Sequence, residues 1–100
     1  MNNDNKVFET AKNGGRHSGT YKQALEKTNA QLNKSIRSYN KKIKEHKNKI
    51  KNPKRYNSNW VKMDIREQTG LIKHWEKEIK NLTGESLILK IVKKERANNE

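Results

Sequence analysis

The sequence predicts an all-α fold: an antiparallel helical hairpin or a small helical bundle, preceded by a flexible glycine-rich arm. Two long stretches place apolar or aromatic side chains at alternating spacings of three and four residues, which is the repeat of a helix that buries one face. The single proline, Pro53, lies between these stretches in a run of turn-forming residues. Two long helices joined by a connection of about ten residues are expected to pack antiparallel.

The first predicted helix covers residues 28–51. Thr28 stands three residues before Gln31, the spacing of a capping box that begins a helix. Proline disfavours a helical conformation in the residue before it, so the helix is expected to end near Pro53. The stripe expected to be buried consists of Leu32, Ile36, Tyr39, Ile43, His46 and Ile50.

The second predicted helix covers residues 63–82, with Asp64 at its start, where an acid complements the helix dipole. Residues 87–92 are ambiguous: the helix could continue past Gly84, a new helix could start at Ser86, or the branched side chains could form a strand. We favour a helix over residues 85–96 because no second strand is evident. The buried stripe of residues 63–82 is expected to be Ile65, Gln68, Ile72, Trp75, Ile79 and Leu82.

The sequence predicts two parts, an N-terminal arm and one small domain. Residues 1–20 are polar and contain three of the five glycines, so we expect a flexible arm. Residues 21–96 form a single small domain that begins with one or two helical turns over residues 21–27. Residues 53–62 form a loop that Tyr56 and Trp60 are expected to anchor to the core. Only 18 of the 100 residues are Leu, Ile, Val or Phe, so the core is small.

Positive charge is concentrated in one part of the chain. The formal net charge is +13, and residues 33–62 hold eleven lysines and arginines against a single acid, Glu45. Such a chain attracts polyanions: nucleic acid, an acidic protein or an anionic membrane. The absence of cysteine excludes a disulfide scaffold and a thiolate zinc site. We expect no membrane span, because no apolar run reaches about 18 residues, and no signal peptide, because residues 1–10 lack an apolar stretch.

A short loop, residues 14–20, concentrates groups that handle phosphate. Its glycines would let backbone N–H groups face an anion, Arg16 would clamp a phosphate, and His17 would move a proton. The loop has the glycine spacing of a P-loop but lacks its lysine. A solvated linker with an incidental histidine is the competing interpretation.

Metal-independent cleavage of RNA needs few protein groups, since the 2′-hydroxyl of the RNA is the nucleophile. One base, one acid and cations for the phosphate suffice. The predicted catalytic residues are His17, His46, Arg16 and Arg37. His46 also fits a partly buried stripe position, and His74 is expected on the helix surface. We expect neither a metal nor a cofactor, because Glu76 and Glu78 would lie on different helix faces and the three histidines are far apart.

Binding to nucleic acid would use the lysine-rich segment and would weaken steeply with salt. Tyr56 and Trp60 would either stack on bases or anchor the loop. The predicted phosphate-binding residues are Lys41, Lys44, Lys47, Lys49, Lys51, Lys54, Arg55 and Arg66.

Four segments, GGRHSGTYK, SIRSYNKKIKEHKNKI, NPKRY with a later Trp, and DIREQTGLIKHWEKEI, resemble C-terminal toxin modules of polymorphic bacterial toxins, of the rearrangement-hotspot and wall-associated kinds. The resemblance covers roughly residues 14–82. It implies a cytotoxic domain, often a nuclease, that a carrier delivers into the cytoplasm of a competing bacterial cell, and an acidic immunity protein as partner. Those modules follow a carrier, whereas this sequence starts at Met1, as an excised module, a detached module or a stand-alone gene would. The matching positions are His17, Arg37, His46, Trp60, Arg66, Gln68 and Trp75.

Three functions remain open on these grounds. The favoured one is a small toxin ribonuclease acting on RNA, with tRNA as one candidate, because the glycine-histidine loop has no evident use in a plain binding protein. The second is a non-catalytic nucleic-acid-binding accessory protein of a phage or plasmid. The third is a helical module that docks an acidic protein. A homodimer that buries the apolar stripes is compatible with each of them.

Overall fold

The structure, a computed structural model, describes residues 3–99, so predictions that fall on residues 1, 2 and 100 lie outside the described residues. Every element in this range is helical, which confirms the predicted all-α class. The molecule is elongated, with extents of 56 × 25 × 22 Å. The elements in chain order are α1 (Asn3–Lys12), α2 (Ser18–Glu26), α3 (Asn29–Lys51), α4 (Pro53–Tyr56), the 3₁₀ turn η1 (Trp60–Lys62) and α5 (Ile65–Asn98).

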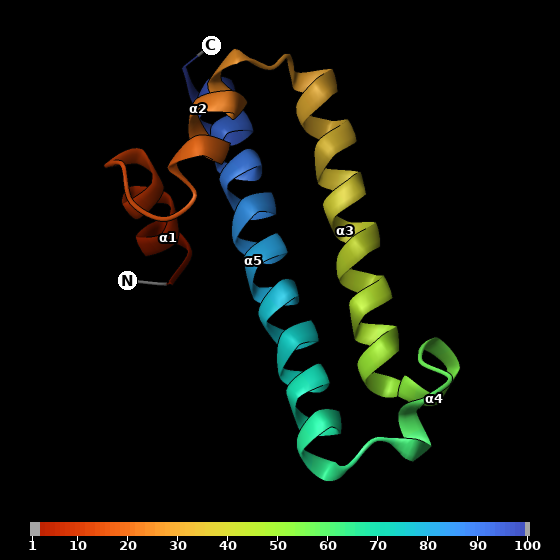
Figure 1. The fold of residues 1–100 in the computed structure, drawn as a ribbon. Helices are drawn as coiled ribbons and strands as arrows, with labels where there is room; N and C mark the ends of the chain where they lie inside the picture. The colour runs from red at the N-terminus through yellow and green to blue at the C-terminus, as the bar shows by residue number, and fades with distance from the viewer. Residues whose placement is uncertain (1–2, 100) are drawn as a thin grey trace.

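Helices α3 and α5 run antiparallel along the whole molecule (Figure 1). The predicted capping box at the start of α3 is confirmed: the Gln31 backbone N–H donates to the Thr28 hydroxyl at 3.2 Å, and the Thr28 N–H donates to the Gln31 side chain at 2.9 Å. Helix α3 ends at Lys51, two residues before Pro53, as predicted. Residues close in sequence, the Thr28–Gln31 capping box and Pro53, therefore set the two ends of α3.

Helix α5 is longer than predicted, because the segments expected over residues 63–82 and 85–96 are one continuous helix that passes Gly84. Its start is capped by Asp64, whose carboxylate accepts the backbone N–H of Glu67 at 2.9 Å. The strand alternative for residues 87–92 is wrong. Ile88, Leu89 and Val92 are all buried, and their three- and four-residue spacing points them inward only if the segment is helical.

The prediction of a flexible arm over residues 1–20 is wrong for its described part. Residues 3–12 form α1, and Phe8 and Ala11 of this helix are buried. The Phe8 ring meets the Tyr21 ring edge-on, with 5.6 Å between their centroids. Two buried side chains in a polar segment give only a weak periodic pattern, yet their burial stabilises the packing of α1 on the core.

The main core lies at the end where α1 and α2 pack against α5 (Figure 1). Its buried members are Phe8, Ala24, Leu32, Leu89 and Val92. The Arg96 guanidinium fastens α2 to α5 by donating to the carbonyls of Ala24 and Leu25 at 3.0 and 3.2 Å. We call this end the head (residues 3–40 and 80–98), the two-helix part the stem (residues 41–51 and 67–79) and the turn the tip (residues 52–66).

The tip is folded rather than loose. Trp60 stacks on Trp75 of α5 at 6.4 Å between centroids, which confirms that Trp60 anchors the loop. The same prediction is wrong for Tyr56, which is 45% exposed, and Ile65, expected on the buried stripe, is 75% exposed. Trp60 is thus the aromatic residue of the tip that reaches α5.

No helix in the described part of the chain combines the length and the apolar character needed to cross a bilayer.

Candidate functional site

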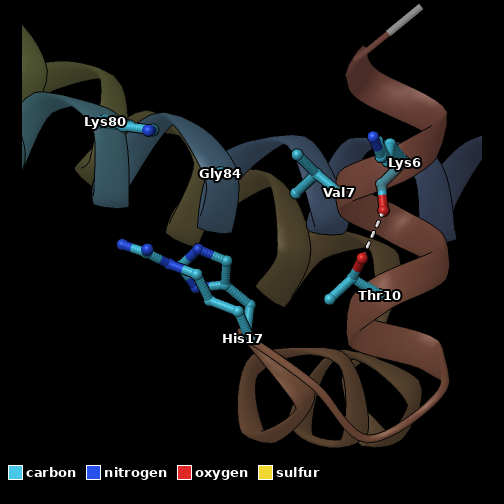
Figure 2. Close-up of a pocket in the computed structure, with 7 residues that line it drawn as sticks. Lys6, Val7, Thr10, His17, Lys80 and Gly84 are labelled. Atoms are coloured by element: carbon cyan, nitrogen blue, oxygen red, sulfur yellow. Dashed lines mark hydrogen bonds between the residues drawn. The ribbon is translucent and has the colours of Figure 1, made fainter.

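A cavity of about 430 Å³ lies in the head, between α1, the loop before α2, and the middle of α5. Figure 2 shows α1 on one side of it, with α5 passing above His17 at Gly84. A cavity of this size can hold a group as large as a nucleotide. Its lining residues are Lys6, Val7, Thr10, Arg16, His17, Lys80 and Gly84.

The loop that carries His17 is shaped by the way α1 ends. The Gly15 N–H donates to the Thr10 carbonyl at 2.8 Å and the Gly14 N–H to the Ala11 carbonyl at 3.2 Å, which is the bond pattern of a Schellman cap. Gly14 adopts φ +91°, and a Cβ on Gly15 would lie 2.7 Å from the Thr10 methyl group. The predicted anion nest is therefore wrong for Gly14 and Gly15, because their N–H groups already cap α1.

His17 itself has a left-handed backbone, with φ 69°, and is the one non-glycine residue with positive φ in the described range. Such a conformation is unfavourable for a side chain with a Cβ and marks a position that its surroundings hold in place. The next residue, Ser18, begins α2. The turn thus places the imidazole over α5 rather than in solvent.

The imidazole of His17 lies against α5 and is oriented by two neighbouring residues. Its Nδ1 is 3.9 Å from the Glu85 carboxylate, with the two side chains 11% and 30% exposed. On its other edge, a Cβ built on Gly84 would lie 2.9 Å from Nε2. Only glycine at position 84 lets the ring rest here. Glu85 is placed to orient the ring and to stabilise it when it carries a proton.

Glu85 also connects the site to α3. The Tyr39 hydroxyl donates a hydrogen bond to the Glu85 carboxylate, and burial, the charge of Glu85 and this bond together raise the pKa of Tyr39 to about 12. Tyr39 therefore stays neutral and keeps donating throughout the physiological range. His17, Glu85 and Tyr39 form a chain of contacts that joins the loop, α5 and α3.

The cavity is strongly cationic. Lys6, Arg16 and Lys80 line it, and no carboxylate is among the lining residues. The Arg16 guanidinium is held toward α5 by a hydrogen bond to the Asn81 side chain. Among the described residues, no cluster of three His, Asp or Glu side chains is arranged to hold a metal ion. The arrangement suits an anionic ligand beside a proton-transfer group.

The structure brings together two of the four predicted catalytic residues. Arg16 and His17 share the cavity, whereas His46 and Arg37 are not among its lining residues. His46 lies seven residues beyond Tyr39 on α3, about 10 Å along the helix axis. It is half-buried, and its Nδ1 has no hydrogen-bond partner in the described part of the chain. Arg37 is exposed on α3.

The predicted phosphate-binding residues lie on the stem and the tip, away from the cavity. All of them are exposed except Lys49, which is half-buried. They cover α3, α4 and the first turn of α5. Their role in binding nucleic acid stays a prediction.

Sequence reasoning missed Lys6, Lys80, Glu85 and Tyr39 as site residues. Lys6 and Lys80 gave no signal, because the docking of α1 was not anticipated. The sequence did contain a signal for Tyr39 and Glu85. Tyr39 lies 23 residues before residue 62 in the turn, and Glu85 lies 23 residues after it. An antiparallel hairpin that turns near residue 62 therefore places the two residues opposite each other. The observed bond from Lys93 to Asn33 follows nearly the same register.

Comparison of this chain with protein-family models, with curated proteins and with solved structures finds no match. The geometry of the site is therefore the basis for assigning a function.

Proposed function

We propose that this protein is a small ribonuclease that cleaves RNA by metal-independent transesterification, with the head cavity as its active site. The observation that carries the proposal is the position of His17. Its imidazole is held between Gly84 and Glu85 at the edge of a cavity lined by three cations and no carboxylate. This reaction needs at least one group that transfers a proton and cations that stabilise the phosphate. His17, oriented by Glu85, and the cationic cavity beside it would supply both.

The reaction divides simply between the RNA and the protein. His17 takes the proton of the ribose 2′-hydroxyl, and the oxygen attacks the adjacent phosphorus. The bond to the 5′-oxygen breaks, that oxygen takes a proton from water or a lysine ammonium, and a 2′,3′-cyclic phosphate remains. Lys6, Arg16 and Lys80 stabilise the charge that builds on the phosphate.

Glu85 and Tyr39 act as positioning residues in this scheme. The Glu85 carboxylate faces Nδ1 of His17 at 3.9 Å, so it would hold the proton on Nδ1 and leave Nε2, which lies beside Gly84 at the cavity wall, to accept the proton of the 2′-hydroxyl. The Tyr39 hydroxyl bonds to that carboxylate. His46, about two helical turns further along α3, is not needed for this step.

The same activity gives the resemblance to polymorphic toxin modules a chemical basis. A ribonuclease released in the cytoplasm of a competing bacterium would be toxic to it. The producing cell would then need an acidic immunity protein, and the +13 net charge of the chain favours association with such a partner.

The test compares two matched histidine variants on total RNA, tRNA and plasmid DNA, with and without EDTA. His17→Asn removes the imidazole but keeps a residue that tolerates a left-handed backbone. His74→Asn makes the same change at an exposed histidine on α5. We expect RNA cleavage that survives EDTA, intact DNA, and a loss of about 100-fold or more for His17→Asn alone.

Gel-shift binding separates catalysis from attraction between charges. We expect His17→Asn to bind RNA as tightly as the unchanged protein, with the same dependence on salt. Intact RNA with the unchanged protein, together with equal gel shifts for both variants, would leave a nucleic-acid-binding protein. Weak RNA binding together with tight binding to one acidic protein would leave a protein-docking module.

A further inference from the structure

The tip of the hairpin exposes more apolar side-chain surface than any other part of the described chain. Tyr56, Val61 and Ile65 are 45, 64 and 75% exposed. All three lie within ten residues of one another, at the far end of the molecule from α1 and α2 (Figure 1). The one other large exposed apolar side chain in the described residues is Leu25, which is 53% exposed and lies at the end of α2.

The exposure of these side chains is fixed by the structure of the tip. The Gln68 side chain donates to the Trp60 carbonyl at 2.7 Å, and the Asn57 side chain accepts the N–H of Asn59 at 3.0 Å. Trp60 stacks on Trp75 of α5. The tip is therefore a braced turn that directs Val61 and Ile65 outward.

Exposed cations share the tip with these apolar side chains. Residues 52–66 contain Lys54, Arg55, Lys62 and Arg66, all exposed, against a single acid, Asp64. The Asp64 carboxylate is engaged in capping α5 through the Glu67 N–H. The surface thus combines aliphatic side chains with a net positive charge.

We propose that the tip binds the surface of an anionic lipid bilayer, with Val61, Ile65 and Tyr56 entering the boundary between headgroups and acyl chains. Lysine and arginine side chains beside them would reach anionic headgroups while their methylene stems follow the apolar side chains inward. This inference is independent of catalysis in the proposed ribonuclease, because no residue of the tip lines the cavity.

The shape and chemistry of the tip favour a bilayer over the other polyanions that the chain attracts. The tip is the convex end of a molecule 56 Å long, and a convex end can enter a bilayer without a matching concave surface. A protein partner would have to supply one. Phosphates of RNA would attract the cations but gain nothing from aliphatic side chains, so RNA leaves Val61 and Ile65 unexplained.

Geometry allows the tip and the cavity to act at the same time. Gly84 lies 19 residues after Ile65 on the same helix, which is about 28 Å along its axis. A chain attached through its tip would therefore hold the cavity of the head in the water beside the membrane.

Vesicle flotation with matched variants tests the proposal. The tip variant is V61S/I65S, and the control is L25S, which removes an equally exposed side chain from the head. The vesicles are phosphatidylcholine mixed with phosphatidylglycerol, and phosphatidylcholine alone. We expect binding to the anionic vesicles only, a loss of affinity of about tenfold or more for V61S/I65S, and no change for L25S.

Tryptophan fluorescence supplies a second measurement on the same samples. Trp60 adjoins Val61, so brominated lipids should quench its emission when the tip enters the bilayer. Circular dichroism and retention on heparin should be the same for all three proteins, which shows that folding and charge are unchanged. Three results would overturn the proposal: no binding to anionic vesicles, equal binding by V61S/I65S, or binding without quenching by brominated lipids.

Discussion

The head and the stem are built from the same two long helices, yet they bury their side chains to very different extents. In the head, α1 and α2 cover α5, and Phe8, Ala24, Leu32 and Leu89 are among its buried residues. In the stem, α3 and α5 pack on each other without α1 or α2, and Trp75, on which Trp60 of the tip stacks, is the one buried residue in that part of the described chain. A surrounded helix supports a fixed site, whereas an isolated helix pair supplies a cationic surface.

The cavity illustrates why the chemistry is found in the head. His17 has a left-handed backbone conformation that only a well-packed neighbourhood maintains. Three separate elements meet at Glu85: the loop through His17, α5 itself, and α3 through Tyr39. The stem has no third element that could orient a side chain in this way.

The largest expected effect comes from emptying the head core. Leu89 is 1% exposed, so Leu89→Ala should lower the free energy of unfolding by about 2–5 kcal/mol, because it leaves a cavity among buried side chains. Ile72→Ala in the stem, where the side chain is half-buried, should cost about 1 kcal/mol. Urea denaturation of the two variants measures the difference, and equal losses would contradict the contrast between head and stem.

Two glycines of α5, Gly84 beside the site and Gly70 in the stem, distinguish an effect on the position of His17 from an effect on helix stability. A Cβ on Gly84 meets His17 Nε2 at 2.9 Å, whereas a Cβ on Gly70 meets nothing within 4 Å. Gly84→Ala should displace the imidazole and lower RNA cleavage by about tenfold or more. Gly70→Ala should leave cleavage unchanged and stabilise the protein by about 1 kcal/mol. Full cleavage by Gly84→Ala would show that the position of His17 against α5 is unimportant.

The caps of the two long helices lie in different regions of the molecule. Thr28 caps α3 in the head and Asp64 caps α5 at the tip, and removal of either cap should cost about 1 kcal/mol locally. Thr28→Ala should lower global stability in urea. Asp64→Ala should mainly accelerate amide exchange over the first turn of α5, because the tip can open without unfolding the head. A global loss as large for Asp64→Ala as for Thr28→Ala would show that the chain unfolds as one unit.

The smallest expected effect is a dependence of stability on high pH. The folded pKa of Tyr39 is about 12 against an ordinary value of 10.0. Since the folded state holds its proton more tightly, this stabilisation is complete below pH 10 and is lost as the pH rises through 12. Thermal unfolding from neutral pH upward should show the loss, and Tyr39→Phe should reduce it. An identical profile for Tyr39→Phe would contradict the raised pKa of Tyr39.

Local signals predicted the hairpin, while the site depends on contacts that no local signal contains. Thr28 with Gln31 and Asp64 before α5 fix helix starts by bonds within a few residues, so their sequence patterns are sufficient. The cavity needs α1, but the sequence of this segment contains few apolar side chains and predicted a flexible polar arm. It also needs Glu85 opposite Tyr39, a pairing set by the register of two helices across the turn. His17 was identified because histidine in a glycine loop is conspicuous, but its partners were not.

The most direct test of the central claim is the chemistry at the cleaved bond. The unchanged protein and His17→Asn would be incubated in EDTA with a short RNA and with the same RNA carrying 2′-O-methyl groups, and the products identified by mass spectrometry. We expect the unchanged protein alone to cut the unmodified RNA, leaving 2′,3′-cyclic phosphate ends. Cleavage of the methylated RNA, or equal cleavage by His17→Asn, would contradict a transesterification in which His17 activates the 2′-hydroxyl.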